Sequence, residues 1–236
     1  MDRSLNRREF LAMVAGAGAA LVASSEAAGQ ATTDTLVPRR EFGRTGVKIS
    51  QLCLGGGSFL GTDSGPLLDE ALKRGVDCWE IVSFSGRAYR DYFEAHPGVR
   101  ERIFLTGKVR STDPAVMQAE LDKLLADNGT SLIDFLAIHT IDDPRLLTDE
   151  VRKWAEKARK EKKVRFFGFC THRSMDGCLR AAADLDWIDG IQTVYNYRLQ
   201  QIGTMEEALH KCHRKGIGVF AIKTMGLTVL REAELQ

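Results

Sequence analysis

Three residues in the middle of the sequence carry the side chains of an acid–base site, and each lies at or just after a short apolar run. They are Glu80, Lys108 and His139. If these runs are neighbouring parallel strands, the three side chains meet at one end of the sheet. Lys108 would then pair with Glu80 in a partly dry site, and the cation would lower the pKa of a neighbouring hydroxyl. The same pattern also fits a structural ion pair with His139 as a hydrogen-bonded core residue.

The elements that would position these residues alternate between strands and helices. From Val47 onward, apolar runs rich in β-branched residues alternate with helical periodicities of about 10 to 15 residues. The expected strands are Ser50–Leu54, Cys78–Val82, Ile103–Val109, Ile133–Ile141, Val164–Cys170, Gly190–Tyr195 and Gly218–Thr224. The expected helices are Pro66–Arg74, Arg87–Ala95, Pro114–Asp127, Thr148–Lys162, Ser174–Asp184 and Met205–Lys215.

This alternation predicts an α/β fold with a parallel sheet and right-handed crossovers. Seven strands in strict alternation favour a (β/α)₈ TIM barrel over a doubly wound sheet. The segment Leu54–Gly57 also lacks the G-x-G-x-x-G pattern of dinucleotide-binding sheets. Barrels of this kind usually have roughly 250 residues. We therefore expect a barrel over residues 47–236 that lacks its eighth strand and helix, preceded by a linker and barrel start at 32–46.

Several ordered motifs resemble those of the aldo-keto reductases, and together they extend from Pro38 to about Leu227. The matching segments are Arg40–Ser50, Leu52–Gly55, Ala71–Val76, Phe104–Lys108, Asp134–His139, Gly168–His172 and Gln192–Asn196. The resemblance implies a (β/α)₈ barrel that binds NADP(H) across its strand ends and transfers a hydride to a carbonyl group. It also implies a catalytic set of Asp, Tyr, Lys and His, in which Tyr is the general acid.

The catalytic positions of this family are only partly kept. Lys108 and His139 match the family's Lys and His, and Glu80 stands where the family has Asp. Ser85 falls at the Tyr position, and a serine hydroxyl is far less acidic than a phenol, whose reference pKa is about 10. Two other groups are candidates for the proton donor: Tyr89, one helical turn further on, and a protonated His139.

The cofactor positions implied by the resemblance are mixed as well. Thr171 and Gln192 offer hydrogen bonds where the family holds the nicotinamide carboxamide, and His172 replaces the commoner Asn. Lys223 and Thr224 occupy the segment in which many relatives place an aromatic residue that stacks on nicotinamide. The family's eighth strand and following helix, which grip the adenosine phosphate, have no counterpart.

The favoured function is that of an NADP-dependent oxidoreductase acting on a small carbonyl or alcohol substrate, weakened by the loss of the usual Tyr. The alternative is a non-catalytic barrel, a pseudoenzyme or a fragment, that binds a ligand or a partner and keeps Lys108 and His139 for structure. The substrate is not specified, because its pocket depends on loops such as Thr140–Leu147.

The N-terminal segment resembles a twin-arginine signal peptide. Arg7 and Arg8 precede a weakly apolar run, Leu11–Ala23, and a small-residue stretch that ends at Ala31. The apolar run is shorter than the roughly 20 residues of a spanning helix. Residues 1–31 therefore predict recognition by the twin-arginine export machinery, contact with the membrane only through this segment, and a periplasmic location. The alternatives are an uncleaved anchor and a chance basic start.

Composition excludes several other classes of function. The formal net charge of +1 and the lack of a basic stripe interleaved with aromatic residues argue against nucleic-acid binding. The five cysteines include no C-x-x-C pair, so no zinc ribbon or iron–sulfur cluster is predicted. Most lie in expected strands or on helix faces, where Cys behaves as a small buried hydrophobe. His210 and His213 lack a third ligand nearby, and no metal site is predicted.

Overall fold

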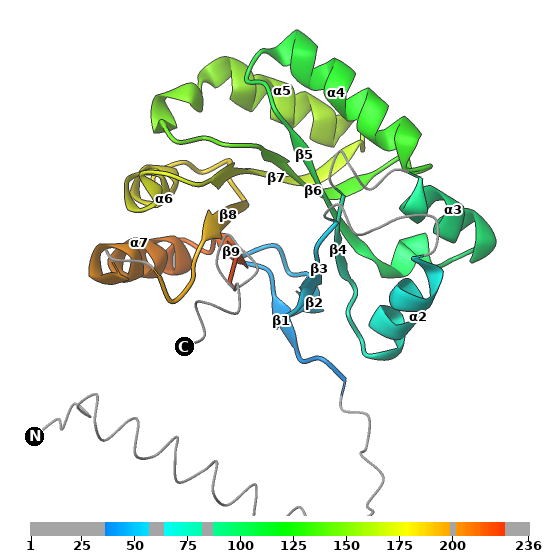
Figure 1. The fold of residues 1–236 in the computed structure, drawn as a ribbon. Helices are drawn as coiled ribbons and strands as arrows, with labels where there is room; N and C mark the ends of the chain where they lie inside the picture. The colour runs from blue at the N-terminus through cyan, green and yellow to red at the C-terminus, as the bar shows by residue number, and fades with distance from the viewer. Residues whose placement is uncertain (1–35, 57–63, 82–86, 199–201, 225–236) are drawn as a thin grey trace, which may run out of the picture. The chain divides into compact units, whose positions relative to one another are not determined.

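The computed structural model describes residues 36–56, 64–81, 87–198 and 202–224 (Figure 1). The expected signal peptide and Ser85 lie outside these residues. The described helices include none that is long and apolar enough to cross a membrane.

Seven parallel strands form one curled sheet in which each strand pairs with the next one in the chain (Figure 1). The strands are β3 (Cys53–Leu54), β4 (Cys78–Glu80), β5 (Phe104–Val109), β6 (Ile133–Ile138), β7 (Val164–Thr171), β8 (Gly190–Val194) and β9 (Gly218–Ile222). Sequential order is that of a barrel, because a doubly wound sheet reverses its order at a switch point. The expected α/β barrel architecture is therefore confirmed. Among the described residues, β3 and β9 are the two edges of the sheet.

Six α-helices connect the described strands and cover the outer face of the sheet (Figure 1). They are α2 (Gly65–Lys73), α3 (Ala88–Ala95), α4 (Pro114–Asp127), α5 (Asp149–Lys160), α6 (Met175–Ala182) and α7 (Ile202–Arg214), with short 3₁₀ turns at Arg100–Arg102 and Pro144–Leu146. The start of α4 is capped by Asp113, whose carboxylate accepts hydrogen bonds from the backbone of Ala115 and Val116. These bounds agree with the expected helices to within a few residues.

The first expected strand is wrong in part. Residues 39–50 form an antiparallel hairpin of β1 (Arg39–Glu41) and β2 (Lys48–Ser50), and only Cys53–Leu54 joins the parallel sheet. The backbone N–H of Ser50 donates to the Asp77 carboxylate at 2.7 Å, and the Ser50 hydroxyl accepts from the backbone N–H of Asp77 and Cys78. These bonds fix the end of the hairpin and redirect the chain into β3.

The expected fourth strand also ends earlier, at Ile138 rather than Ile141. Thr140 has a φ of 64°, a left-handed conformation that no strand continues through. His139 therefore stands at the last position before a sharp turn.

Phe42, in the hairpin, fills the interior at the end where the strands begin. Its ring lies 5.6, 5.4 and 4.7 Å from the rings of Phe104, Phe135 and Phe220, measured between centroids. A Cβ atom on Gly190 or Gly218, the first residues of β8 and β9, would collide with this ring. The interior is thus packed at one end, and polar side chains converge at the other.

Candidate active site

The candidate site lies on the inner face of the sheet, at the carboxyl ends of the strands. Cys78 belongs to the inner core cluster around Phe42, and Glu80 shares its face because side chains alternate along a strand. The same alternation places Lys108 inward on β5 and Gln192 inward on β8, where it pairs in register with Cys170. Parallel strands of a barrel therefore bring these groups to one mouth, as the sequence predicts.

Glu80 and Lys108 form a largely buried ion pair. The Lys108 Nζ lies 2.8 Å from Glu80 Oε1, and each side chain is 16% exposed. Gln192 donates from Nε2 to the same carboxylate oxygen at 3.1 Å. Its own Oε1 is buried and has no hydrogen-bond partner among the described residues. The pairing predicted between strands two and three is thus present, and it includes a third residue from β8.

His139 follows β6 directly, and its backbone is hydrogen-bonded to the neighbouring strand β5. Its backbone N–H donates to the carbonyl oxygen of Val109 at 2.7 Å. The ring Nδ1 is buried and has no hydrogen-bond partner among the described residues. Burial, followed by the charge of Lys108, lowers the pKa of the His139 imidazole below its usual value. The lowered pKa disfavours the protonated ring, which speaks against His139 as the general acid.

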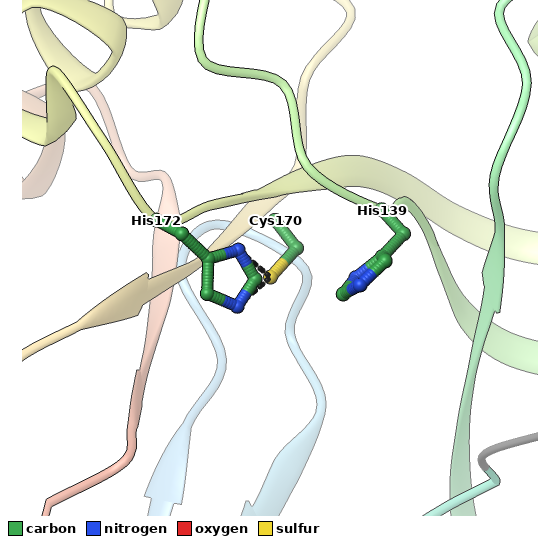
Figure 2. Close-up of side chains that lie close together, drawn as sticks. All are labelled: His139, Cys170 and His172. Atoms are coloured by element: carbon green, nitrogen blue, oxygen red, sulfur yellow. Dashed lines mark hydrogen bonds between the residues drawn. The ribbon is translucent and has the colours of Figure 1, made fainter. Parts of the chain in front are cut away.

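Cys170 and His172 lie on the same face of β7 and its end, beside His139 (Figure 2). The Cys170 Sγ is 3.8 Å from His172 Nδ1 and 3.9 Å from His172 Nε2. The rings of His139 and His172 are 5.3 Å apart between centroids and nearly perpendicular, at 82°. Burial raises the pKa of the Cys170 thiol to about 11. Sequence reasoning treated this cysteine only as a small apolar residue, although its spacing of two from His172 in a strand places both on one face.

Asp142 fixes the loop that carries His172. One of its carboxylate oxygens accepts from the backbone N–H of His172 and of Arg173, each at 2.9 Å, and from the Thr171 hydroxyl at 3.2 Å. Burial opposes ionisation of Asp142, but these hydrogen bonds outweigh it and lower its pKa. Sequence reasoning missed this residue, because an acidic residue in a loop carries no distinctive signal.

Thr171 faces away from the other site residues. It is fully buried, and its hydroxyl lies 2.9 Å from the Arg173 carbonyl oxygen as well as near Asp142. The expected hydrogen bond from Thr171 to a nicotinamide carboxamide stays a prediction.

Lys223 and Thr224 follow β9 and are exposed. Thr140, Ser174 and Lys223, which come after β6, β7 and β9, all have positive φ angles, of 64°, 46° and 56°. Such strained residues gather at functional sites more often than elsewhere. Their position supports the carboxyl end of the sheet as the functional end.

Tyr89, the alternative proton donor, is engaged elsewhere. Its phenol donates to the carbonyl oxygen of Glu80 at 3.1 Å, and its ring stacks on Trp79. The side chain is completely buried, and burial raises its pKa far above the usual range. Tyr89 is therefore a core residue on the helix side of β4.

A cavity of about 1030 Å³ lies away from this site, along the hairpin, α7 and β9. None of the predicted site residues lines it; its wall includes Phe42, Leu209 and Val219. The strand ends remain the candidate site, because polar groups converge there and two of them have no hydrogen-bond partner within the described ranges.

No protein-family model and no curated protein matches this sequence. Solved structures do match the fold. Two are of proteins from Pseudomonas aeruginosa assigned as aldo-keto reductases: one is 19% identical, covers 81% of this chain and 80% of its own, and has a TM-score of 0.70. The second is also 19% identical, with coverage of 79% and 78% and a TM-score of 0.67.

The third structure is the holo form of an aldo-keto reductase from Bacillus halodurans. It is 21% identical, the match covers 78% of this chain and 65% of that protein, and the TM-score is 0.65. These identities are too low to transfer an activity, but the scores establish a common architecture. The described part of this chain therefore has the α/β barrel fold that solved aldo-keto reductases have.

Proposed function

We propose that this protein is an oxidoreductase that transfers a hydride between NADP(H) and a small carbonyl or alcohol substrate. The observation that carries this proposal is the buried Lys108–Glu80 pair, with His139 on the next strand, at the end of the barrel where such enzymes bind substrate. A buried ion pair costs desolvation energy and is weak evidence for stability. Its position beside buried polar groups that have no partner in the described part of the chain therefore favours a role in binding and catalysis.

The residues at the mouth fit the nicotinamide end of the cofactor. Gln192 Oε1 is a buried acceptor without a partner among the described residues, and a primary carboxamide would supply the missing N–H. Gln192 and His172 are the residues that would hold this group, and Lys223 and Thr224 would flank it. The cofactor supplies the hydride; the protein orients the reactants and stabilises the developing charge.

The carbonyl oxygen of the substrate would lie between Lys108 and His139. When the hydride adds to the carbonyl carbon, the electron pair of the C=O bond moves to oxygen. The Lys108 ammonium group and a ring N–H of His139 donate hydrogen bonds to this developing alkoxide. The proton that completes the alcohol reaches the oxygen from solvent by way of these donors, because Ser85 replaces the phenol that the resemblance implies.

A non-catalytic, ligand-binding barrel is the second candidate. One observation favours it: the phenol of Tyr89, the alternative proton donor, is bonded to the Glu80 carbonyl and buried in the core. In this case the barrel would bind a ligand or a partner without turnover, and Lys108 and His139 would be kept for structure.

We also propose that the protein acts in the periplasm. The support is the Arg7–Arg8 pair ahead of the apolar run Leu11–Ala23. Folding before export would let the chain load its cofactor in the cytoplasm.

The deciding experiment measures cofactor binding and turnover separately. Purified protein is titrated with NADPH by fluorescence, and NADPH oxidation is then followed with a panel of small aldehydes and ketones. Binding with turnover that Lys108→Met abolishes supports the oxidoreductase. Binding without turnover supports the ligand-binding barrel. If NADPH does not bind, the protein uses it neither for catalysis nor as a ligand.

A further inference from the structure

Cys170 lies between two imidazole rings in a cluster that the proposed reaction does not explain. One ligand atom from each of His139, Cys170 and His172 lies within 4.8 Å of the other two (Figure 2). Two imidazoles and one thiol are ligands for soft or borderline transition metals. We propose that His139, Cys170 and His172 bind a single Cu⁺ ion.

The separations fit a three-coordinate ion. Metal bonds of about 2.3 Å to sulfur and 2.0–2.1 Å to nitrogen, at 120° to each other, place sulfur and nitrogen about 3.8 Å apart. The Cys170 Sγ lies 3.8 and 3.9 Å from the two nitrogens of His172. Because the sulfur is almost equidistant from them, the His172 ring must rotate to direct one nitrogen at the ion. The ligand atoms lie within 4.8 Å of one another, so the His139 nitrogen needs to approach by at most about 1.2 Å to complete the trigonal set.

The surroundings of His139 favour metal binding for a second reason. Its Nδ1 is buried and has no hydrogen-bond partner among the described residues. A buried polar atom in this state costs free energy, and a bound metal or a ligand removes that cost. His172, in turn, is held in place through Asp142, which binds the backbone of its loop. Metal-binding histidines usually have such supporting contacts.

The charges around the cluster select a monovalent ion. Lys108, Arg110 and Lys223 act on the two histidines with positive charge, and Glu80 and Asp142 with negative charge. Glu80 is paired with Lys108, which leaves Arg110 and Lys223 against Asp142. A divalent ion with one thiolate would add positive charge where cations already outnumber anions. Cu⁺ with one thiolate is neutral, and it accepts a trigonal set without a fourth ligand. On binding, the Cys170 thiol releases its proton to solvent and copper keeps its oxidation state, so no oxidant is needed.

This inference stands apart from the proposed function, because copper binding requires no cofactor or substrate. If the proposed function also holds, copper would use His139 and His172 and would compete with the nicotinamide group. Failure of the NADPH experiment and failure of copper binding are therefore separate results.

The test is an anaerobic titration of the purified chain with Cu⁺, kept reduced by ascorbate, against a chromogenic Cu⁺ chelator. A second thiol pair, Cys53 and Cys78, pairs in register across β3 and β4 and offers two sulfurs to copper. The titrations are therefore run in the Cys53→Ser/Cys78→Ser variant. In this background, Cys170→Ser removes the proposed ligand, and Cys212→Ser is the matched control. Cys212, on α7, is also fully buried, but its thiol donates to the carbonyl oxygen of Leu179 on α6.

We expect one Cu⁺ per chain in the background variant, no change with Cys212→Ser, and a loss of affinity of at least about 100-fold with Cys170→Ser. X-ray absorption of the copper-loaded Cys53→Ser/Cys78→Ser variant identifies the ligand atoms directly, without a contribution from the Cys53–Cys78 pair. One sulfur and two nitrogen neighbours support the site. Unchanged affinity in Cys170→Ser, tighter binding of Zn²⁺ than of Cu⁺, or two sulfur neighbours in the absorption spectrum would overturn the proposal.

Discussion

The Lys108 Nζ lies 2.8 Å from Glu80 Oε1, across the neighbouring strands β5 and β4, with both side chains 16% exposed. Glutamate thus makes the contact that the resemblance assigns to the shorter aspartate. Gln192, on β8, faces the same interior and donates a hydrogen bond to the same oxygen at 3.1 Å. The longer side chain is accommodated because a third residue fixes its carboxylate.

Removing first one and then both charges of this pair should separate its effect on stability from its effect on carbonyl reduction. Lys108→Met leaves an uncompensated carboxylate, so we expect a loss of about 3–5 kcal/mol in the free energy of unfolding. Adding Glu80→Leu removes that carboxylate and should restore most of the stability while carbonyl reduction stays abolished. Urea unfolding and NADPH oxidation measure the two effects. If the double variant regains activity along with stability, the pair has no catalytic role.

Ser85→Tyr should increase carbonyl reduction, because it restores a phenol at the position implied by the resemblance. General acid catalysis typically contributes about 10²–10⁴-fold. Lys108→Met in the same chain should remove the gain, since it removes the cation expected to promote ionisation of that phenol. Steady-state kinetics of the two variants check this, with Ser85→Phe as the control for ring size. A Ser85→Tyr chain that binds NADPH but is no faster than wild type would contradict the alignment.

Phe42→Ala should destabilise the protein by about 3–5 kcal/mol, because it empties the packed end of the barrel. Gly218→Ala should also destabilise it, since the new methyl group meets the Phe42 ring. Combining the two should cost less than their sum, because the smaller residue at 42 makes room for the methyl group. Urea denaturation of the wild type, the two single variants and the double variant gives the coupling free energy between the two positions. Strict additivity would show that Phe42 and Gly218 do not contact each other.

Asp142→Ala should weaken the binding of Cu⁺ by His172 without unfolding the barrel. Its carboxylate accepts three hydrogen bonds from the loop after β7, so their loss frees His172 from a fixed position. We expect Cu⁺ affinity to fall about 10–100-fold, with Asp143→Ala as the control. The Asp143 carboxylate pairs with exposed Arg145 at the surface. Equal effects of the two substitutions would argue against a positioning role for Asp142.

Replacing Arg7 and Arg8 by lysine should keep the protein in the cytoplasm, because the export route recognises the arginine pair. Cell fractionation and immunoblotting of the wild-type and double-lysine chains measure this. Arg39→Lys/Arg40→Lys, in hairpin strand β1, is the control with the same chemical change. Equal export of the double-lysine signal and the wild type would rule out the twin-arginine assignment.

Periodicity and spacing in the sequence determined the barrel and the three strands that carry Glu80, Lys108 and His139. This works because parallel strands in sequential order bring their carboxyl ends together regardless of the loops between them. The start of α4 was also readable, because Asp113 caps it through a purely local contact.

Only the tertiary structure decided which groups meet across the sheet. Gln192 reaches Glu80 from 112 positions away, and His139, which follows β6, comes to lie beside Cys170 on β7. Tyr89 turned into the core, and residues 39–50 became a hairpin whose Phe42 fills the interior. Strand register and side-chain packing set these outcomes. They depend on contacts between distant residues, which no local pattern of the chain contains.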